Sequence, residues 1–384
     1  MAEKNKKNSV WFKSPWLEAN IMIAAIAIAA VALAIISNAA TTPADGGMPT
    51  AQISWLLLAF FLISFVIAVV AVIAGIGGGV LFTPIMLAFT PVNSLIIRAT
   101  GLIVAMFSGL ISTGIFMKNG LGNFRMSITL TISQGIGAFL GAQGAVYVSS
   151  AFGASGEGPL RLALGIILVF LGFYFISGGK KLEYPTVKTV DRFTKLFNLD
   201  GEYYEGSENR IVKYRVTRLG LGFLLTFIVG LMGGFFGMGA GWAITPVQNL
   251  GLGIPLKAAA ANSGIILGMV DCVAVWPYIL SGSIIPLFVL PWLAGQVTGG
   301  YIGALLLSRL KVHFVRIILI GIMFFTSFGL LSDALFKLGV ISMKLPPATN
   351  LIVFLAITLF VAFAIIRAHK RDQMNTAQEK NNHE

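Results

Sequence analysis

The sequence predicts an all-α polytopic membrane protein with two inverted-topology repeats of about five segments each. Its glycine-broken helices are expected to meet near the midplane, with one extra helix at each end. Three observations predict this class. Hydrophobic residues make up 57% of the chain and charged residues 11%, whereas soluble domains average about 25% charged residues. Apolar runs of about 20 residues, long enough to cross a hydrocarbon core, recur along the chain. Two parts of the sequence also match each other.

The first apolar segment, 21–40, follows an arm with four lysines and precedes the small residues "SNAA". This arrangement fits either a cleaved signal peptide or a retained helix. The apolar stretch is long and the basic region lies far from its start, which favours a retained helix. We therefore expect a cytosolic N-terminal arm at 1–20, and a first transmembrane helix with an outer loop at 21–52.

The other apolar segments fall into two groups around a charged stretch. The short segments 79–90 and 241–252 are too brief for ordinary spans, and whether they cross fully stays open. An amphipathic helix is expected around 188–198 within the charged stretch. The expected divisions are transmembrane repeat 1 at 53–177, a charged cytosolic linker at 178–217, transmembrane repeat 2 at 218–332, an outer loop and last transmembrane helix at 333–367, and a cytosolic tail at 368–384.

Lysine and arginine predict the orientation. They gather in both tails, in the linker and in loops 118–125 and 308–312, whereas 41–52, 149–158 and 281–283 are nearly free of them. Because basic loops stay on the cytoplasmic side, we expect about twelve crossings with both termini cytoplasmic, in the cell inner membrane or plasma membrane. The formal net charge of +12 reflects these loops, so nucleic acid is not an expected partner.

The internal repeat is clearest where helices are interrupted by glycine. "GIGGGVLFTP", which begins at Gly75, matches "GMGAGWAITP", which begins at Gly237, 162 residues later. At the same spacing "QGIGAFLGA" matches "QVTGGYIGA", and with one extra residue "RATGL" matches "ANSGI". Each unit has an odd number of segments, and matched loops differ in charge. The two halves are therefore predicted to be inverted, the construction of many secondary transporters.

The two glycine runs predict an anion site. Irregular backbone at membrane depth is tolerated only when it is buried in protein or lines a cavity. Thr83-Pro84 and Thr245-Pro246 fit the N-cap and first position of a following helix, whose free N–H groups and dipole attract anions. The candidate substrate-binding residues are Gly77, Gly78, Gly79, Thr83, Thr100, Gln134, Gly239, Ala240, Gly241, Trp242, Thr245, Asn262, Ser263 and Gln296.

Each of these candidates also has a simpler structural interpretation. Small residues let helices pack closely, the glutamines Gln134 and Gln296 could bond helices together, and Thr100 and Ser263 could bond to their own helices. Trp242 could be a packing residue. These alternatives stay open at the level of the sequence.

Charged residues inside apolar segments suggest further roles. Asp271 is an acidic residue within "LGMVDCVAVW" and is a candidate for carrying a coupling proton, although a structural hydrogen bond or a place near the outer mouth would also explain it. Arg98 and Lys257 are expected near opposite mouths, where they either attract anions or snorkel to the interface.

The paired breaks, each followed by an Ala-Thr-Gly or Asn-Ser-Gly element, resemble the TauE/SafE sulfite exporter family, also called the toluene sulfonate uptake permease family. The resemblance covers about 53–335. It implies transport of sulfur-containing anions such as sulfite, sulfoacetate and other sulfonates, or thiosulfate, in a direction that the sequence leaves open. The second break departs from the fuller glycine pattern at Ala240 and Trp242.

Competing classes of function are an anion channel, a cation-coupled carboxylate or amino-acid transporter, and an intramembrane enzyme. The enzyme is disfavoured because His313, the histidine nearest an apolar segment, has no acidic cluster beside it, and Cys272 is the single cysteine. We therefore expect no catalytic residue, no cofactor and no metal site. The expected partners are a small anion and membrane lipid, while protons and a second copy in a homodimer are left open.

Overall fold

A computed structural model describes the chain at residues 24, 28, 50–89, 92–152, 157–177, 183–185, 187, 189–205, 209–310 and 312–342. The N-terminal arm, most of the predicted first helix, the predicted last helix and the C-terminal tail lie outside these residues. The predictions for those parts are therefore not addressed by the structure.

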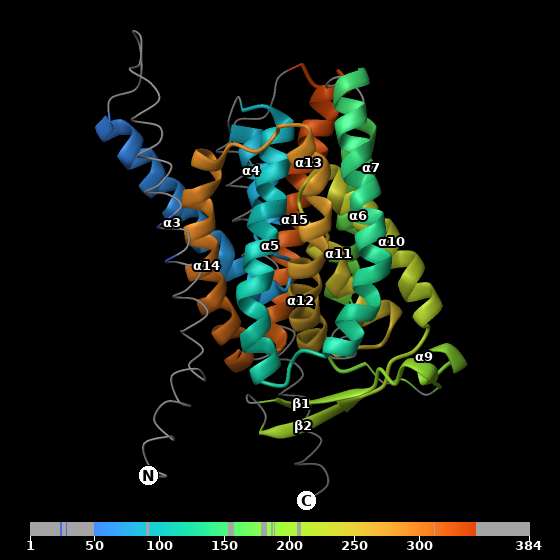
Figure 1. The fold of residues 1–384 in the computed structure, drawn as a ribbon. Coiled ribbons are helices and arrows are strands. Elements are labelled where there is room, and N and C mark those ends of the chain that lie inside the picture. The colour runs from blue at the N-terminus through green and yellow to red at the C-terminus, as the bar shows by residue number, and fades with distance from the viewer. Residues whose placement is uncertain are drawn as a thin grey trace, which may run out of the picture.

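The first half of the described chain consists of helices that run side by side (Figure 1). These are α3 (Thr50–Ala74), α4 (Gly79–Phe89), α5 (Ser94–Lys118), α6 (Phe124–Phe152) and α7 (Glu157–Ser177).

The second half repeats this pattern after a small cap at the lower end of Figure 1. The cap consists of α9 (Arg192–Phe197) and two antiparallel strands, β1 (Gly201–Glu205) and β2 (Arg210–Tyr214). The helices that follow are α10 (Leu219–Phe236), α11 (Gly241–Pro246), the π-helical turn η1 (Val247–Gly251), α12 (Leu256–Ala274), α13 (Trp276–Leu280), α14 (Pro286–Arg309) and α15 (Val312–Lys337).

The chain is mostly helical, as predicted, and it is a multi-pass membrane protein. Within the described residues, five helical stretches are long and apolar enough to cross a membrane: Leu57–Ala74, Ser94–Lys118, Leu219–Phe236, Leu256–Leu280 and Pro286–Leu307. The hairpin β1–β2 departs from the all-helical expectation. Along β1, Tyr203 and Glu205 are buried and their neighbours face outward. This alternation could not be recognised in the sequence, because the strand is short and lies in a polar stretch of mixed charge.

The end of α5 lies beside the beginning of α12. Gly120, at φ 66°, turns the chain after α5, and the side chain of Asn123 caps α6 by accepting from the Met126 N–H at 3.1 Å. The backbone N–H of Asn123 donates to Asn262 Oδ1 at 2.6 Å. Since the last turn of α5 meets the first turns of α12, the two helices run antiparallel.

Two pairs of helices approach closely at glycines that match in the sequence repeat. A Cβ atom added to Gly137 or Gly141 of α6 would lie within 3.0 Å of the Phe227 or Leu231 carbonyl oxygen of α10. The same holds between α14 and α3, where added Cβ atoms at the matched glycines 299 and 303 would meet the carbonyl oxygens of residues 65 and 69. These glycines are packing contacts of the kind that small residues make between membrane helices.

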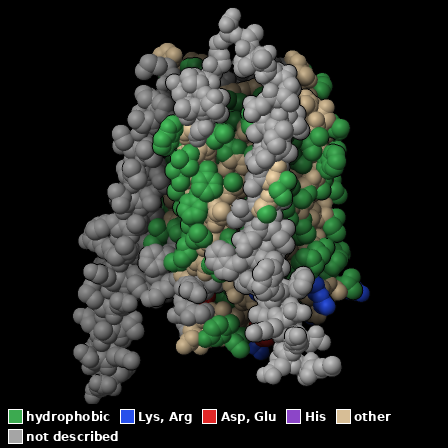
Figure 2. Space-filling model, turned by 60° about the vertical axis from the view of Figure 1, so that its left-hand side comes forward, with side chains coloured by type: hydrophobic (Ala, Val, Ile, Leu, Met, Phe, Trp, Pro, Cys, Tyr) green, Lys and Arg blue, Asp and Glu red, His purple; other side chains and the backbone are tan. Residues whose placement is uncertain are grey.

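The outer surface carries the apolar side chains expected to face lipid. On α6, Ile132, Ile136 and Leu140 recur every four residues and are at least half exposed, so they form one stripe along the helix. Figure 2 shows hydrophobic side chains over the middle of one face, with the visible Lys and Arg side chains near its lower edge. Cys272 is also exposed.

The linker folds against the lower end of the bundle. The predicted helix around 188–198 is shorter than expected: α9 begins after Asp191, whose carboxylate accepts from the backbone N–H groups of Thr194 and Arg218. Although burial acts to raise it, hydrogen bonds from Thr194 and Arg218 bring the pKa of Asp191 below its ordinary value. Within the cap, burial and then the charge of Glu205 raise the pKa of Tyr203.

Candidate functional site

Two glycine-rich turns interrupt the helices, one in each half. The first break (residues 75–78) joins α3 to α4, and the second break (residues 237–240) joins α10 to α11. Gly75 and Gly77 have φ values of 68° and 72°, and Gly237 and Gly239 have values of 64° and 69°. Glycine adopts this left-handed region without the steric cost that a side chain brings. The Gly-x-Gly spacing therefore sets the same turn twice.

The helix starts lie closer to the breaks than the sequence predicted. The expectation that Thr83 and Thr245 are N-caps is wrong, because α4 begins at Gly79 and α11 begins at Gly241. Both threonines lie in the second turn. Pro246 lies inside its helix, where it removes a donor from the helical ladder, and the chain continues as the wider turn η1. The N–H groups at the two helix starts therefore begin with those of Gly79 and Gly241, while the N–H groups of Phe82 and Ile244 already donate to the Gly78 and Ala240 carbonyl oxygens.

The two breaks touch each other through reciprocal contacts. Thr83 Oγ1 donates to the Gly237 carbonyl oxygen at 2.7 Å, and Thr245 Oγ1 donates to the Gly75 carbonyl oxygen at 3.2 Å. Thr83 and Thr245 are matched residues of the repeat, and so are Gly75 and Gly237. The hydroxyl group of each half thus bonds the break of the other half.

Glycine allows this close approach. A Cβ atom added to Gly79 would lie within 3.0 Å of the Met238 carbonyl oxygen, and one added to Gly241 would lie within 3.0 Å of the Ile76 carbonyl oxygen. The helix starts of α4 and α11 therefore pack directly on the opposite break.

The described residues leave almost no free space beside the first break. The gap there is lined by Gly75 and Gly77 together with Ser108, Ser112 and Leu267. Its free volume is about 0 Å³. This gap is therefore closed, and a guest could enter it only after the helices around it move apart.

The Thr/Ser-Gly elements lie at different distances from this centre. Thr100 is buried and donates to the Ile96 carbonyl oxygen of its own helix at 2.8 Å, the bond that its structural interpretation predicted. Its neighbour Gly101 faces the Thr83 hydroxyl and the Gly237 carbonyl oxygen. Ser263 is buried, and its hydroxyl has no hydrogen-bond partner among the described residues. Asn262 is bonded to the loop after α5 and not to a break.

The two matched glutamines differ in their surroundings. Gln296 donates through Nε2 to the backbone oxygen and hydroxyl of Ser64 at 3.2 and 3.1 Å. Its Oε1 has no partner among the described residues and lies against Gly78. Gln134 is fully buried, and neither of its amide atoms has a partner in the described chain. Trp242, which follows the second break, is buried, and its indole N–H has no hydrogen-bond partner among the described residues.

Asp271 lies beside the second break. Its side chain is buried, and an added Cβ atom on Gly239 would be 2.9 Å from its Oδ2. Neither carboxylate oxygen has a hydrogen-bond partner among the described residues. The described residues therefore give no support to the alternative in which Asp271 makes a structural hydrogen bond. An unpaired carboxylate at such a depth is unfavourable, whereas a neutral carboxyl group is far less so.

Arg98 and Lys257 are not at open mouths, and both expectations for them, steering and snorkelling, are wrong. Arg98 is 1% exposed, donates to the Phe235 carbonyl oxygen at 3.2 Å and lies over the Phe235 ring. Lys257 is fully buried and forms an ion pair with Glu205 of β1 at 2.7 Å. Lys257 also donates to the Leu310 carbonyl oxygen. The linker hairpin covers Lys257, which the sequence could not reveal.

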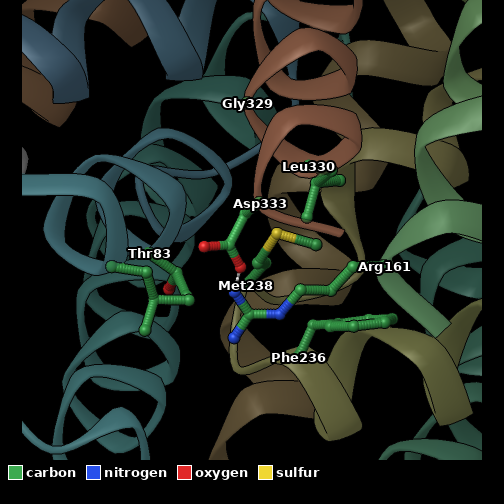
Figure 3. A pocket seen from close by; sticks show the side chains of 8 residues that line it. Thr83, Arg161, Phe236, Met238, Gly329, Leu330 and Asp333 are labelled. Atoms are coloured by element: carbon green, nitrogen blue, oxygen red, sulfur yellow. Dashed lines mark hydrogen bonds and ion pairs between the residues drawn. The ribbon is translucent and has the colours of Figure 1, made fainter. Parts of the chain in front are cut away.

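An ion pair that the sequence did not predict lies beside the second break. Arg161 of α7 is paired with Asp333 of α15 (Figure 3). They line a cavity of about 20 Å³ together with Thr83 and with Phe236 and Met238 of the second-break region. Arg161 lies near the start of α7 and Asp333 near the end of α15, so in the sequence each looks like an ordinary charge that flanks an apolar segment. No motif in the sequence links the two residues.

Ser108 was also missed. Its hydroxyl accepts from the Gly78 N–H at 3.2 Å and donates to the Ala105 carbonyl oxygen. A serine in an apolar helix gives only a weak signal, because such hydroxyls commonly bond their own helix.

The chain matches known proteins over most of this region. A family model described as "Sulfite exporter TauE/SafE" matches residues 59–330. A relative from Bacillus subtilis (strain 168), "Probable membrane transporter protein YunE", is 27% identical over 258 residues, which cover 64% of this chain and 88% of the relative. No solved structure matches the chain.

Proposed function

Because the chain belongs to the sulfite exporter TauE/SafE family, we propose that it is a secondary transporter of small sulfur-containing anions. The proposed substrates are sulfite, sulfonates such as sulfoacetate, and thiosulfate. The proposed mechanism is alternating access around a site at the two breaks. The bacterial relative named as a probable membrane transporter supports the transport class.

The proposal includes inverted repeats. The antiparallel course of the matched helices α5 and α12 supports inversion. The exchanged contacts support a pseudo-two-fold relation, because Gly137 meets residue 227 as Gly299 meets residue 65. Both pairs map onto each other through the spacing of 162 residues that separates Gly75 from Gly237. Inverted repeats of this kind place substrate sites near the bilayer midplane in known transporters.

The reciprocal hydrogen bonds between the breaks are the observation that carries the anion site. They bring the starts of α4 and α11 together, with α11 continued through η1 to Gly251. A helix start presents free N–H groups and the positive end of its dipole. Two such starts that face one centre favour a bound anion over a cation.

Because the two breaks are in contact, we propose that the helices around them must move for transport. Since about 0 Å³ is free beside the first break, the helices around the breaks must separate before an anion can lie between them. We assign the described state to a closed carrier in which the two breaks touch, and the substrate-loaded state to one in which the Thr83 and Thr245 bonds to the opposite break are broken. Alternating access then opens this centre to one side at a time.

Asp271 is the proposed proton carrier. Its carboxyl group lies against Gly239 without a hydrogen-bond partner among the described residues, and an intramembrane carboxyl marks proton pathways in many transporters. Co-transport of one proton would offset one negative charge of the substrate at the closed centre. The end of the bundle that carries the linker is proposed to face the cytoplasm, with both chain termini on the same side.

The test is uptake into liposomes by the purified protein. Radiolabelled sulfite, thiosulfate, sulfoacetate and taurine are offered separately, with and without a pH gradient. We expect saturable uptake of at least one sulfur oxyanion and counterflow of label against unlabelled substrate. Uptake of carboxylates or amino acids alone would overturn the proposal. A current that does not saturate would replace the carrier with an anion channel.

A further inference from the structure

The cavity beside the second break is bordered by a second buried cation, the guanidinium group of Arg161. The side chain of Arg161 is 2% exposed, and that of its partner Asp333 is 14% exposed. The cavity of about 20 Å³ has room for about one water molecule. Among the described residues, Arg161 and Asp333 are the charged ones that line it, together with Thr83, Leu87, Phe236, Met238, Gly329 and Leu330.

The chemistry of this pair points to an anionic guest. A guanidinium group is planar and presents paired N–H donors that match a carboxylate or another oxyanion. A buried guanidinium requires a negative partner, because an uncompensated charge is strongly unfavourable in a protein interior. Asp333 supplies that partner here. A sulfite or sulfonate group would satisfy the same donors in the same place.

The position of the pair connects it to the breaks. Figure 3 shows the Arg161 side chain extending between Met238 and Phe236, with Thr83 and Asp333 on the neighbouring walls. The Thr83 hydroxyl is the group that bonds the Gly237 carbonyl oxygen across the two halves. An anion held by Arg161 would therefore lie next to the contact that the proposed mechanism must break.

Arg98, the other arginine beside the second break, is less suited to this task. Its guanidinium donates to the Phe235 carbonyl oxygen and lies 5.3 Å from the centre of the Phe235 ring. It secures the end of α10, where a cation is favourable beside the last carbonyl groups. Arg161 instead borders the cavity and holds an ionic partner on a different helix.

Building on the proposed function, we propose that Arg161 binds the oxyanion of the substrate and that Asp333 is its resident counter-ion, which the substrate displaces. In the empty carrier the ion pair keeps the guanidinium neutralised. When an anion arrives, the more exposed Asp333 side chain moves away and leaves its place to a sulfur oxyanion. Asp333 thus competes with the substrate for the Arg161 guanidinium group. Because the cavity has room for only about one water molecule, the movement of Asp333 also provides the space that the substrate needs.

The competition predicts opposite effects of two substitutions. Purified protein in detergent is titrated with sodium sulfite, with sodium chloride as the salt control, and the rise in melting temperature reports binding. Asp333→Asn removes the competitor, so sulfite should bind about tenfold more tightly or better and raise the melting temperature more than in the unaltered protein. Arg161→Met should abolish the sulfite-dependent rise.

A double variant distinguishes a loss of sulfite binding from a loss of folding. Arg161→Met/Asp333→Leu leaves no unpaired charge, and such apolar replacements of buried ion pairs are commonly tolerated. We expect it to fold and to have lost the sulfite-dependent rise. The matched control, Lys257→Met/Glu205→Leu, removes the other described buried pair and should keep the rise.

The outcomes separate this inference from the proposed function. An unaltered sulfite response in the Arg161→Met/Asp333→Leu protein, or weaker binding in Asp333→Asn, would overturn the role of the pair while leaving transport intact. An unaltered protein that neither binds nor transports any of the sulfur anions would remove the proposed function and this inference with it.

Discussion

Apart from the threonine of the opposite half, the polar side chains that pack on the first break are uncharged, whereas those that pack on the second break include Arg98 and Asp271. Gly78 donates to the Ser108 hydroxyl and faces the amide of Gln296. At the second break, Arg98 packs on Gly237 and the Asp271 carboxylate lies against Gly239. The backbone conformation is nevertheless the same in both, with matched glycines at positive φ.

The two breaks therefore have the same backbone conformation, which we call the frame, but differ in the charge of the side chains around them. The glycines of both halves are constrained by the contact between the breaks, so they remain alike. The side chains around them are free to differ. We therefore expect changes to the frame to act equally in both halves, and changes to charge to act only at the second break.

The largest effect should come from filling the contact between the breaks. Gly79→Ala and Gly241→Ala each place a Cβ atom within 3.0 Å of an opposite carbonyl oxygen. Overpacking of this kind costs about 1–3 kcal/mol, and each 1.4 kcal/mol placed on a transport barrier slows it about tenfold. Liposome uptake should fall to a similar degree in both variants. Gly135→Ala, where an added Cβ atom meets nothing within 4 Å, is the matched control, and unequal losses in the two halves would break the comparison.

The next effect concerns the charge that only the second break has. Asp271→Asn should remove the stimulation of uptake by an inward proton gradient, because an amide cannot carry the proton. Uptake driven by the substrate gradient alone should persist at a reduced rate. Cys272→Ser, which alters the exposed neighbouring residue, serves as the control. An unchanged response to pH in Asp271→Asn would dismiss the proton-carrier role.

The matched glutamines should respond differently to the same substitution. Gln296→Leu removes two hydrogen bonds to Ser64, each worth about 1 kcal/mol, so the free energy of unfolding should fall by roughly 2 kcal/mol. Gln134→Leu removes an amide without partners among the described residues and should leave stability unchanged or raised. If Gln134 binds substrate, its variant loses uptake while remaining stable. Equal losses of stability in the two variants would contradict the difference in their surroundings.

The smallest effect is expected at Asp191, outside both breaks. It serves as a control for the pH dependence of uptake. Because the pKa of Asp191 is lowered in the folded protein, its contribution to stability is present above its unfolded pKa of about 4 and is lost as pH falls below it. Asp191→Asn should therefore destabilise the linker slightly near neutral pH, since solvent screens this partly exposed group, and should remove this acid dependence. Proteolysis of the linker between pH 3 and 7 measures it, and a pH effect on uptake near neutrality cannot originate from this residue.

The sequence predicted the helical membrane class, the family and the position of both breaks, because glycine spacing and apolar length are local properties. It misplaced the start of α4, since the preference of Thr-Pro for a helix start competes with the glycine turn that precedes it. It could not foresee that Glu205 neutralises Lys257, because 52 residues separate the partners. Arg161 and Asp333 escaped for the same reason: each is an unremarkable terminal charge until the fold pairs them.

The linker fastens one end of the molecule. Asn123 of the first half donates to the Leu199 carbonyl oxygen just before β1, and Lys257 of the second half pairs with Glu205 of β1, so the linker is bonded to both halves. In the proposed alternating access, separating the halves at that end would break these polar bonds, whereas separating them at the opposite end would leave them intact. Under that proposal the linker favours opening at the end of the bundle that lies away from it.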